Sequence, residues 1–189
     1  MPSTDGTHMK RNANIARQQS GFSLVESLIS IVVTLVAAGA AAPGFVSARA
    51  SHRIEGAAAQ LETDIQQARS LAVMGNRSMR ISFKTDSYGS CYIVHDGSAS
   101  ACKCDAQGAA ACTGGATPVR SVRFAVGNPL QVSSNSASLV FDAAKGTVTP
   151  TATMRVVGEG GRGLNLIVNI MGRVRSCSPE KTIKGYPKC

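Results

Sequence analysis

The sequence predicts an α+β protein in which one long N-terminal helix packs on an antiparallel β-sheet. Two observations lead to this class. A continuous apolar run, Phe22–Ala42, is followed by apolar residues at helical spacing to about residue 75. From residue 79 onward, short segments that alternate between apolar and polar residues are separated by Gly, Pro, Ser and Asn, which is typical of strands and turns. A helix that covers one face of such a sheet defines the α+β class.

Composition limits the functions that the chain can have. Its 189 residues support one domain plus an appended element. Lys and Arg number 20 against 11 Asp and Glu, and the net charge of +9 favours anionic partners such as nucleic acid or anionic lipid. Tryptophan is absent and aromatic residues make up only 4%, which disfavours sites that stack bases or sugars.

The first helical segment has the length of a membrane span. The apolar run Phe22–Ala42 forms a helix of about 31 Å, which is enough to cross the hydrocarbon core of a bilayer. Residues 1–21 are polar and net basic, so the N-terminus is expected in the cytoplasm. An ordinary secretory signal has its small-residue cleavage site after the apolar core. Here Gly21 precedes it, so cleavage there would leave the helix on the mature chain.

Glu26 is a carboxylate inside this apolar run, where a charge is costly without a partner. One interpretation is a glutamate near the interface that reaches water. The other is that Glu26 pairs with a positive charge on another molecule. Cleavage after Gly21 creates such a charge, the α-amino group of Phe22. The two groups cannot bond well within one helix, but they can pair between staggered neighbouring helices and set the axial register of a filament.

The segment Gly21-Phe22-Ser23-Leu24-Val25-Glu26, followed by about 16 apolar residues, closely resembles the type III signal of type IV prepilins. The resemblance implies cleavage between Gly21 and Phe22 by a prepilin peptidase, N-methylation of Phe22, and assembly with other pilins through Glu26. It also implies a single-pass stage in a Gram-negative inner membrane, with the head in the periplasm, before export into an extracellular pilus. We therefore divide the chain into a leader (1–21), a transmembrane and filament-core helix (22–43) and a periplasmic head (44–189).

The helix is expected to continue into the head to about residue 75. Six residues at alternating steps of four and three define one apolar face: Ile54, Ala58, Leu61, Ile65, Ala68 and Ala72. The charged residues are expected mostly elsewhere on the surface: Arg53, Glu55, Glu62, Asp64 and Arg69. Pro43-Gly44 should kink or locally melt the helix, and Gly75-Asn76 should end it.

Five later segments are predicted as strands: Met79–Phe83, Val119–Val126, Leu139–Phe141, Met154–Val157 and Leu164–Val174. We expect them to form an antiparallel sheet whose inner face packs on the second half of the helix. A long N-terminal helix on such a sheet is the pilin fold.

The six cysteines all follow the membrane segment, on the side that the charge rule places in the oxidising periplasm: Cys91, Cys102, Cys104, Cys112, Cys177 and Cys189. Cys177 and Cys189 are expected to pair, which stabilises the fold by about 3 kcal/mol through loop closure. Cys102 and Cys104 are too close in sequence to pair comfortably with each other. They are expected to bond separately to Cys91 and Cys112, in either order.

A zinc site is the alternative use of these cysteines. Cys102, Cys104 and Cys112 have a spacing that occurs in metal sites, with Cys91 or His95 as a fourth ligand. The oxidising compartment disfavours this alternative, and no metal or cofactor is expected. His95 is interpreted instead as a surface or strand-end histidine.

Positive charge is concentrated near the C-terminus. Removal of residues 1–21 takes away three basic groups and one acid, which leaves a net charge of +7. Residues 155–189 hold seven basic groups and two acids, or +5 of that charge. A basic cluster of this kind favours an anionic partner. The alternative is a solvated basic edge that discourages aggregation of the sheet.

Within this region, Gly172-Arg173-Val174-Arg175 follows the apolar run Leu164–Met171. In an extended chain Arg173 and Arg175 point to the same side, with Cα atoms about 7 Å apart. Two guanidinium groups so placed can bridge neighbouring phosphates. Gly172 lacks a side chain, so a phosphate backbone is expected to approach it closely. Arg162 lies on a glycine-rich loop and offers a third guanidinium.

The prepilin start, the helix end Leu61–Met74 and the following strand resemble the GspH/FimT family of minor pilins and pseudopilins. In that family a C-terminal Gly-Arg-x-Arg motif marks FimT-like minor pilins that bind DNA. The resemblance implies that Arg173 and Arg175 contact DNA. Four weaker candidates are Arg162, Lys181, Lys184 and Lys188. The leading hypothesis is a minor type IV pilin that binds double-stranded DNA without sequence preference, in DNA uptake for natural transformation.

Two alternatives use the same N-terminus. One is a structural minor pilin that primes assembly or sits at the pilus tip, and the other is a GspH-type pseudopilin of a type II secretion system. Neither needs the C-terminal basic cluster. An enzyme is not expected, because the sequence has no nucleophile motif, phosphate loop, Rossmann fingerprint or paired-carboxylate pattern.

Overall fold

The computed structural model describes residues 23–105, 107–181 and 183–189, which fall into two compact units, one ending at Ala42 and the other comprising Pro43–Cys189. Helix α1 (Leu24–Met74) begins after Ser23, whose Oγ accepts a hydrogen bond from the backbone N–H of Glu26 at 3.2 Å. Pro43-Gly44 lies at the junction of two segments of this helix, Leu24–Ala40 and Gly44–Met74.

A membrane crossing is not established by α1. In the described part of the chain, no single helix combines the length and the apolar composition that a span requires, and the two segments of α1 meet this requirement only as a pair. The transmembrane span over residues 22–43 therefore stays a prediction.

The second half of α1 buries the apolar face that the sequence predicts. Its six residues from Ile54 to Ala72 are at most 3% exposed. The charged residues of this helix were predicted to lie mostly at the surface. For Asp64 this prediction is wrong, because its side chain is only 1% exposed. The helix ends as expected at Gly75-Asn76. Asn76 adopts a positive φ of 44°, and the N–H of Arg77 donates to the carbonyl of Ala72 at 3.2 Å, which closes the last turn.

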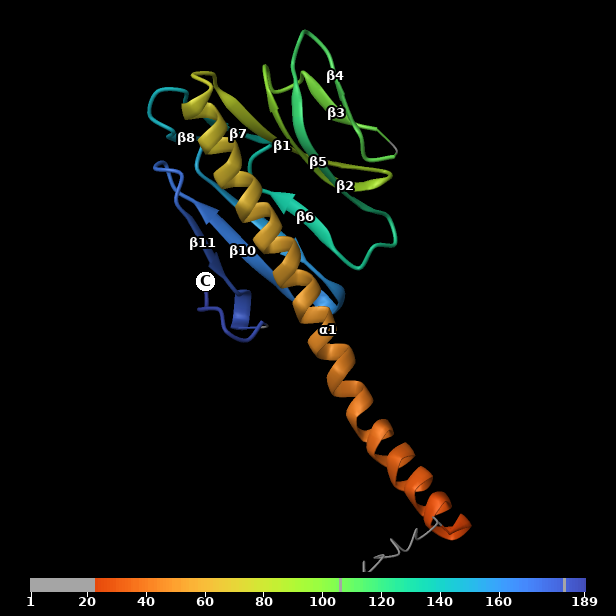
Figure 1. Cartoon of the computed structure of the whole chain (residues 1–189). Coiled ribbons are helices and arrows are strands. Elements are labelled where there is room, and N and C mark those ends of the chain that lie inside the picture. The colour runs from red at the N-terminus through yellow and green to blue at the C-terminus, as the bar shows by residue number, and fades with distance from the viewer. Residues whose placement is uncertain (1–22, 106, 182) are drawn as a thin grey trace, which may run out of the picture. The chain divides into compact units, whose positions relative to one another are not determined.

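The strands of the head form two larger antiparallel sheets and one hairpin within the described residues (Figure 1). The first sheet has the order β5-β2-β1-β7-β8, with bounds Pro118–Ala125, Gly89–Asp96, Met79–Asp86, Ser138–Phe141 and Val148–Thr149. The second has the order β11-β10-β9-β6, with bounds Val174–Cys177, Gly163–Val168, Ala152–Val157 and Gln131–Ser134. The hairpin consists of β3 (Cys102–Cys104) and β4 (Ala110–Cys112), and two short 3-10 helices, η1 (Glu159–Gly161) and η2 (Pro179–Lys181), complete the chain.

Both larger sheets contribute to one hydrophobic core against α1. Alternate residues of β1, β9 and β10 belong to this core, as the alternation in the sequence predicts. Strand β2, which was not predicted from the sequence, is buried on both faces. This arrangement confirms the α+β prediction. The single strand predicted over Leu164–Val174 was wrong, because β10 ends at Val168 and a turn precedes β11. Gly172 causes this break, since its φ of +73° belongs to a tight turn.

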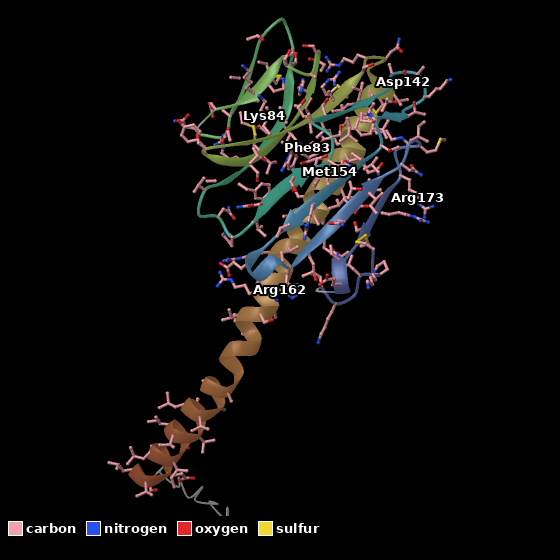
Figure 2. All side chains as sticks on the ribbon, turned by 180° about the vertical axis from the view of Figure 1, so that it is seen from behind. Phe83, Lys84, Asp142, Met154, Arg162 and Arg173 are labelled. Carbon is pink, nitrogen blue, oxygen red and sulfur yellow. A yellow bond between two sulfur atoms is a disulfide. The ribbon has the colours of Figure 1, made fainter. Side chains whose placement is uncertain are left out.

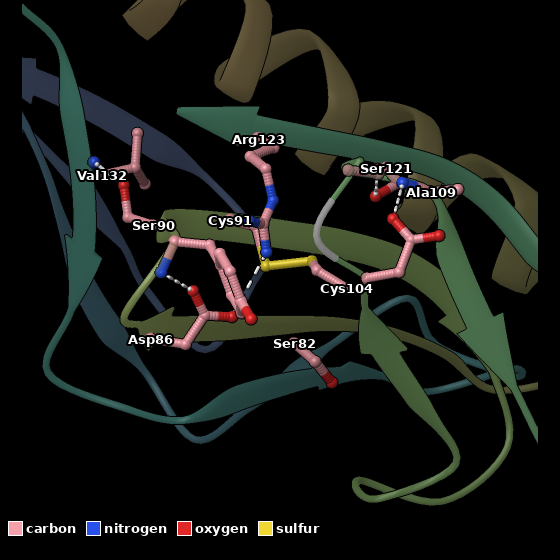
Figure 3. The surroundings of a disulfide bond; sticks show 12 residues. Ser82, Asp86, Ser90, Cys91, Cys104, Ala109, Ser121, Arg123 and Val132 are labelled. Atoms are coloured by element: carbon pink, nitrogen blue, oxygen red, sulfur yellow. Dashed lines mark hydrogen bonds and ion pairs between the residues drawn. A yellow bond between two sulfur atoms is a disulfide. The ribbon is translucent and has the colours of Figure 1, made fainter. Parts of the chain in front are cut away.

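The β3–β4 hairpin covers the face of the first sheet that α1 leaves open. Cys91 in β2 is bonded to Cys104 in β3, and Cys102 is bonded to Cys112 across the hairpin. Figure 3 shows the Cys91–Cys104 bond beneath Arg123, whose guanidinium forms an ion pair with Asp86 at 3.2 Å. This pairing resolves the order that the sequence left open.

His95 is the next-to-last residue of β2, so the prediction of a strand-end histidine is confirmed, whereas the alternative of a surface histidine is wrong. Its side chain is fully buried in β2, and its Nε2 lies 2.9 Å from Oγ of Ser82 in β1. The sequence alone does not predict this burial, because it depends on a partner in another strand, Ser82 of β1.

Candidate nucleic-acid interface

The turn between β10 and β11 fixes the start of the Gly-Arg-x-Arg segment. The N–H of Asn169 donates to the carbonyl of Arg173 at 3.1 Å, and the N–H of Gly172 donates to the carbonyl of Asn169 at 2.9 Å. The side chain of Asn169 also accepts a hydrogen bond from the N–H of Arg173 at 3.0 Å. These bonds hold Arg173 as the last residue before β11.

The register of β10 and β11 places the two arginines on one side. Ile167 pairs with Arg175, and Val168 pairs with Val174. Val174 is partly buried against the core, so its neighbours Arg173 and Arg175 point to the opposite, outer face of the sheet, where both are exposed. The structure thus brings together the two residues that the motif singled out.

Gly172 has a different role from the one expected. It is buried, and a Cβ atom there would lie 3.1 Å from Cδ of Arg69 and 3.2 Å from the carbonyl oxygen of Gly146. The expectation that a phosphate backbone approaches Gly172 was therefore wrong. Glycine is needed at this position for the turn and for the close contact with α1.

The C-terminal segment adds a lysine to the outer face. The third disulfide joins Cys177 at the end of β11 to Cys189, which is the pair predicted from the sequence. Lys188 and Arg175 line the same shallow concavity of about 480 Å³, together with Ile167 and the disulfide. The disulfide therefore brings the positive charge of Lys188 to the side of Arg175.

Arg155 was missed as a site residue by the sequence reasoning. It is exposed in β9 and pairs with Asn165 of β10, which pairs in turn with Cys177 of β11. Arg155 therefore points to the same outer face as Arg175, at about 12 Å between Cα atoms from standard sheet spacings. The strand order β11-β10-β9 is needed to see that Arg155 lies near Arg175. From the sequence, only the alternation of residues 154–157 indicated which way Arg155 points. We call Arg155, Arg173, Arg175 and Lys188 the outer basic face.

Two other predicted contacts, Arg162 and Lys184, are not part of this face. Arg162 precedes the first residue of β10, whereas Arg173 lies beside the other end of that strand, about 23 Å away along the strand axis. Figure 2 shows the two residues well apart. Lys184 lines a second concavity with Arg162. The side chain of Lys181 and the cleavage site Gly21-Phe22 lie outside the described residues, and Glu26 is exposed on α1.

All six cysteines are disulfide-bonded, so the thiolates that the zinc alternative requires are not present. Across residues 23–105, 107–181 and 183–189, no group of three or more His, Cys, Asp or Glu side chains is placed to hold a metal ion.

The fold and the N-terminal segment define the class of the protein. A long N-terminal helix packed on antiparallel sheets is the pilin fold, and residues 16–42 match the prokaryotic N-terminal methylation motif. This motif and the helix are those of a membrane-anchored pilin. Residues 57–172 match the family model described as type II transport protein GspH, and the chain belongs to this family of minor pilins and pseudopilins. Its members are structural pilin subunits rather than enzymes.

A solved minor pilin shares the fold. The type IV minor pilin FimU of Pseudomonas aeruginosa is 22% identical, with a TM-score of 0.51 over 68% of this chain and 94% of FimU. The minor pseudopilin EpsH from the type 2 secretion system of Vibrio cholerae is 11% identical, with a TM-score of 0.47 over 68% of this chain and 98% of EpsH. No curated protein matches the chain significantly.

Proposed function

We propose that the chain is a minor type IV pilin that binds double-stranded DNA without sequence preference and acts in DNA uptake for natural transformation. The observation that carries this proposal is the outer basic face, which gathers Arg155, Arg173, Arg175 and Lys188 from three segments of the chain. Contacts of Lys and Arg with phosphates supply the sequence-independent part of DNA affinity.

The character of this face supports a duplex held by its backbone. The outward-pointing residues of β9, β10 and β11, all of which the structure describes, include no carboxylate that would repel phosphate. They also include no aromatic ring on which the bases of a single strand would stack. Neutral side chains fill the space between the cations, among them Thr153, Asn165 and Ile167.

Assembly and location complete the proposal. A prepilin peptidase cleaves between Gly21 and Phe22, Phe22 is N-methylated, and Glu26 pairs with the new N-terminus of a neighbouring pilin. Before assembly the chain crosses the inner membrane once, with the N-terminus in the cytoplasm and the head in the periplasm. Afterwards it is part of an extracellular pilus. The methylation motif and the family match support this sequence of steps.

The test is fluorescence anisotropy of short duplex DNA with the full chain in neutral detergent micelles. Arg173→Ala/Arg175→Ala is compared with Lys84→Ala/Lys103→Ala, which removes the same charge from exposed residues of β1 and β3. The first variant is expected to raise Kd by about tenfold or more and to reduce the salt slope by about 2. The second should change Kd less than about twofold, because two exposed charges away from the site act weakly through screening solvent.

Further variants test the extent of the site. Arg155→Ala should weaken binding by a few-fold, whereas Arg162→Ala/Lys184→Ala should leave Kd nearly unchanged. Equal losses in all charge-deleting variants would show that only net charge matters and would contradict the proposed site. Absence of binding at low salt would contradict DNA uptake altogether. It would favour a structural minor pilin for assembly or tip priming, or a GspH-type pseudopilin of type II secretion.

A further inference from the structure

A second basic concavity lies at the base of the head, apart from the outer basic face. It has a volume of about 470 Å³ and lies between the start of the head segment of α1, the loop before β10 and the C-terminal segment. Figure 2 shows Arg162 beside α1 at this end of the sheet. The side chains that matter for its chemistry are those of Ser47, Ser51, His52, Glu55, Arg162 and Lys184.

Arg162 is placed at this concavity by its backbone. Its carbonyl oxygen accepts a hydrogen bond from the N–H of Gly158 at 2.8 Å, which closes the turn that contains η1. The next residue, Gly163, already pairs with Val157 of β9. The position of Arg162 is therefore fixed by the sheet, although its neighbours in sequence are mostly glycine.

The guanidinium of Arg162 faces two hydroxyl groups on one side of α1. Its Nη1 lies 3.4 Å from Oγ of Ser47 and 3.5 Å from Oγ of Ser51. Both distances are at the long limit for hydrogen bonds, so the hydroxyls hold the guanidinium only weakly. Because Ser47 and Ser51 are four residues apart, they lie one above the other on the same helix face. One oxygen-rich anion can accept hydrogen bonds from all three groups.

The charge of the lining suits a single anion. Arg162 and Lys184 contribute two positive charges. The lining carboxylate, Glu55, is occupied by His52, whose Nδ1 lies 3.0 Å from its Oε2. Arg49 and Arg53 are exposed on the same helix segment and add positive charge nearby. A phosphodiester matches this set, because it carries one negative charge and has several acceptor oxygens.

The chain itself keeps this concavity near the membrane. Ser47 follows Ala42, the last apolar residue of the predicted span, by five positions. Five residues reach at most about 17 Å when extended and about 7.5 Å as a helix. The headgroup layer on each side of the hydrocarbon core is roughly 5–7 Å thick. Ser47 is therefore within reach of lipid headgroups if residues 22–43 span the bilayer as proposed.

We propose that this concavity binds the phosphate of an anionic phospholipid headgroup and holds the base of the head against the membrane before the subunit enters a filament. Arg162 and Lys184 neutralise the phosphate, and Ser47 and Ser51 donate hydrogen bonds to its oxygens. The proposal rests on the membrane anchoring of the chain and is independent of DNA binding. It gives Arg162 and Lys184 a role at the end of the head that the outer basic face does not reach.

Lipid retention by the full chain tests the proposal. The chain is embedded in nanodiscs that contain phosphatidylglycerol and phosphatidylcholine, released, and examined by native mass spectrometry for the lipid that stays bound. Phosphatidylglycerol should be retained over phosphatidylcholine. Arg162→Ala/Lys184→Ala should reduce that preference several-fold, and Ser47→Ala/Ser51→Ala should reduce it less. Lys84→Ala/Lys103→Ala removes the same charge elsewhere and should retain the wild-type preference.

Hydrogen exchange of the backbone over residues 44–55 is the second measurement. Nanodiscs with phosphatidylglycerol should slow exchange in this segment compared with pure phosphatidylcholine. Inorganic phosphate added to pure phosphatidylcholine nanodiscs should not reproduce this effect. If it does, the site binds a free anion and the lipid assignment is overturned. Equal retention of both lipids, or the same loss of preference in the Lys84/Lys103 control, also overturns it. If Arg162→Ala/Lys184→Ala fails to fold, the serine variant, which keeps every charge, decides the outcome.

Discussion

The hydroxyl of Tyr92 donates a hydrogen bond of 2.7 Å to the carboxylate of Asp64 and so joins β2 to α1 inside the head. Asp64 also accepts a hydrogen bond from Gln60 at 3.0 Å and forms an ion pair with Nε of Arg120 at 3.0 Å. A buried carboxylate is tolerated only when such partners replace water. The other side chains that α1 buries completely are apolar, so this group of bonds favours one register of α1 on the sheet.

Removal of the carboxylate should be costly. Asp64→Ala leaves the Tyr92 hydroxyl and the Arg120 guanidinium without their shared partner, and we expect the free energy of unfolding to fall by about 3 kcal/mol. Gln67→Ala, on the exposed side of the same helix, should change it by no more than about 0.5 kcal/mol. Urea denaturation of both variants measures the difference. Equal effects would mean that the Asp64 bonds contribute little.

Tyr92 should make the head sensitive to alkaline pH. Burial, with a further contribution from the hydrogen bond to Asp64, raises the pKa of Tyr92 well above its ordinary value of 10.0. Above pH 10.0 the unfolded chain loses this proton while the folded chain keeps it, so the stabilisation present below pH 10.0 is lost as the pH rises. The slope is at most about 1.4 kcal/mol per pH unit. Denaturation on both sides of pH 10.0 should show a smaller slope for Tyr92→Phe, and an unchanged slope would assign the effect to other groups.

Removal of either of two disulfides with similar loop lengths should lower stability, but only one of the two removals should weaken DNA binding. Cys177→Ser/Cys189→Ser and Cys102→Ser/Cys112→Ser open loops with sequence separations of 12 and 10 residues, and each should lower stability by about 3 kcal/mol. Only the first releases Lys188 from the side of Arg175, so only the first should weaken the proposed DNA binding. Thermal melts and anisotropy below the melting temperature test both parts. A matching loss of affinity in the second pair would contradict the placement of Lys188 in the site.

Gly172→Ala should test the tight turn. Gly172 and Gly160 have similar positive φ values of 73° and 70°, but only Gly172 has neighbours within 4 Å of the added Cβ atom. Both substitutions should cost about 1–2 kcal/mol for the left-handed backbone. Gly172→Ala should cost about 1 kcal/mol more, because Arg69 and Gly146 must move. Denaturant titration of the two variants measures the excess, and equal costs would show that the contact relaxes freely.

Features with a local cause were predictable from the sequence. The buried face of α1 follows from its apolar spacing, and the helix end follows from Gly75-Asn76. The burial of Asp64 and of His95 was not predicted, because it depends on partners from other segments, namely Arg120 and Ser82. At the candidate site, the motif and strand alternation predict that Arg173 and Arg175 share a side. The place of Arg155 in the site was not predicted, because the order of strands is set by long-range packing that no local pattern encodes.

The two disulfides around the β3–β4 hairpin interleave along the chain. Cys91 skips Cys102 to reach Cys104, and Cys102 skips Cys104 to reach Cys112. If the head is exported to the periplasm as proposed, Cys91 and Cys102 reach the oxidising side before either of their native partners. Oxidation in order of emergence therefore forms a wrong bond first, and thiol–disulfide exchange must correct it. The yield of native head should accordingly depend on a disulfide isomerase, and not only on an oxidant, in the cell that exports it.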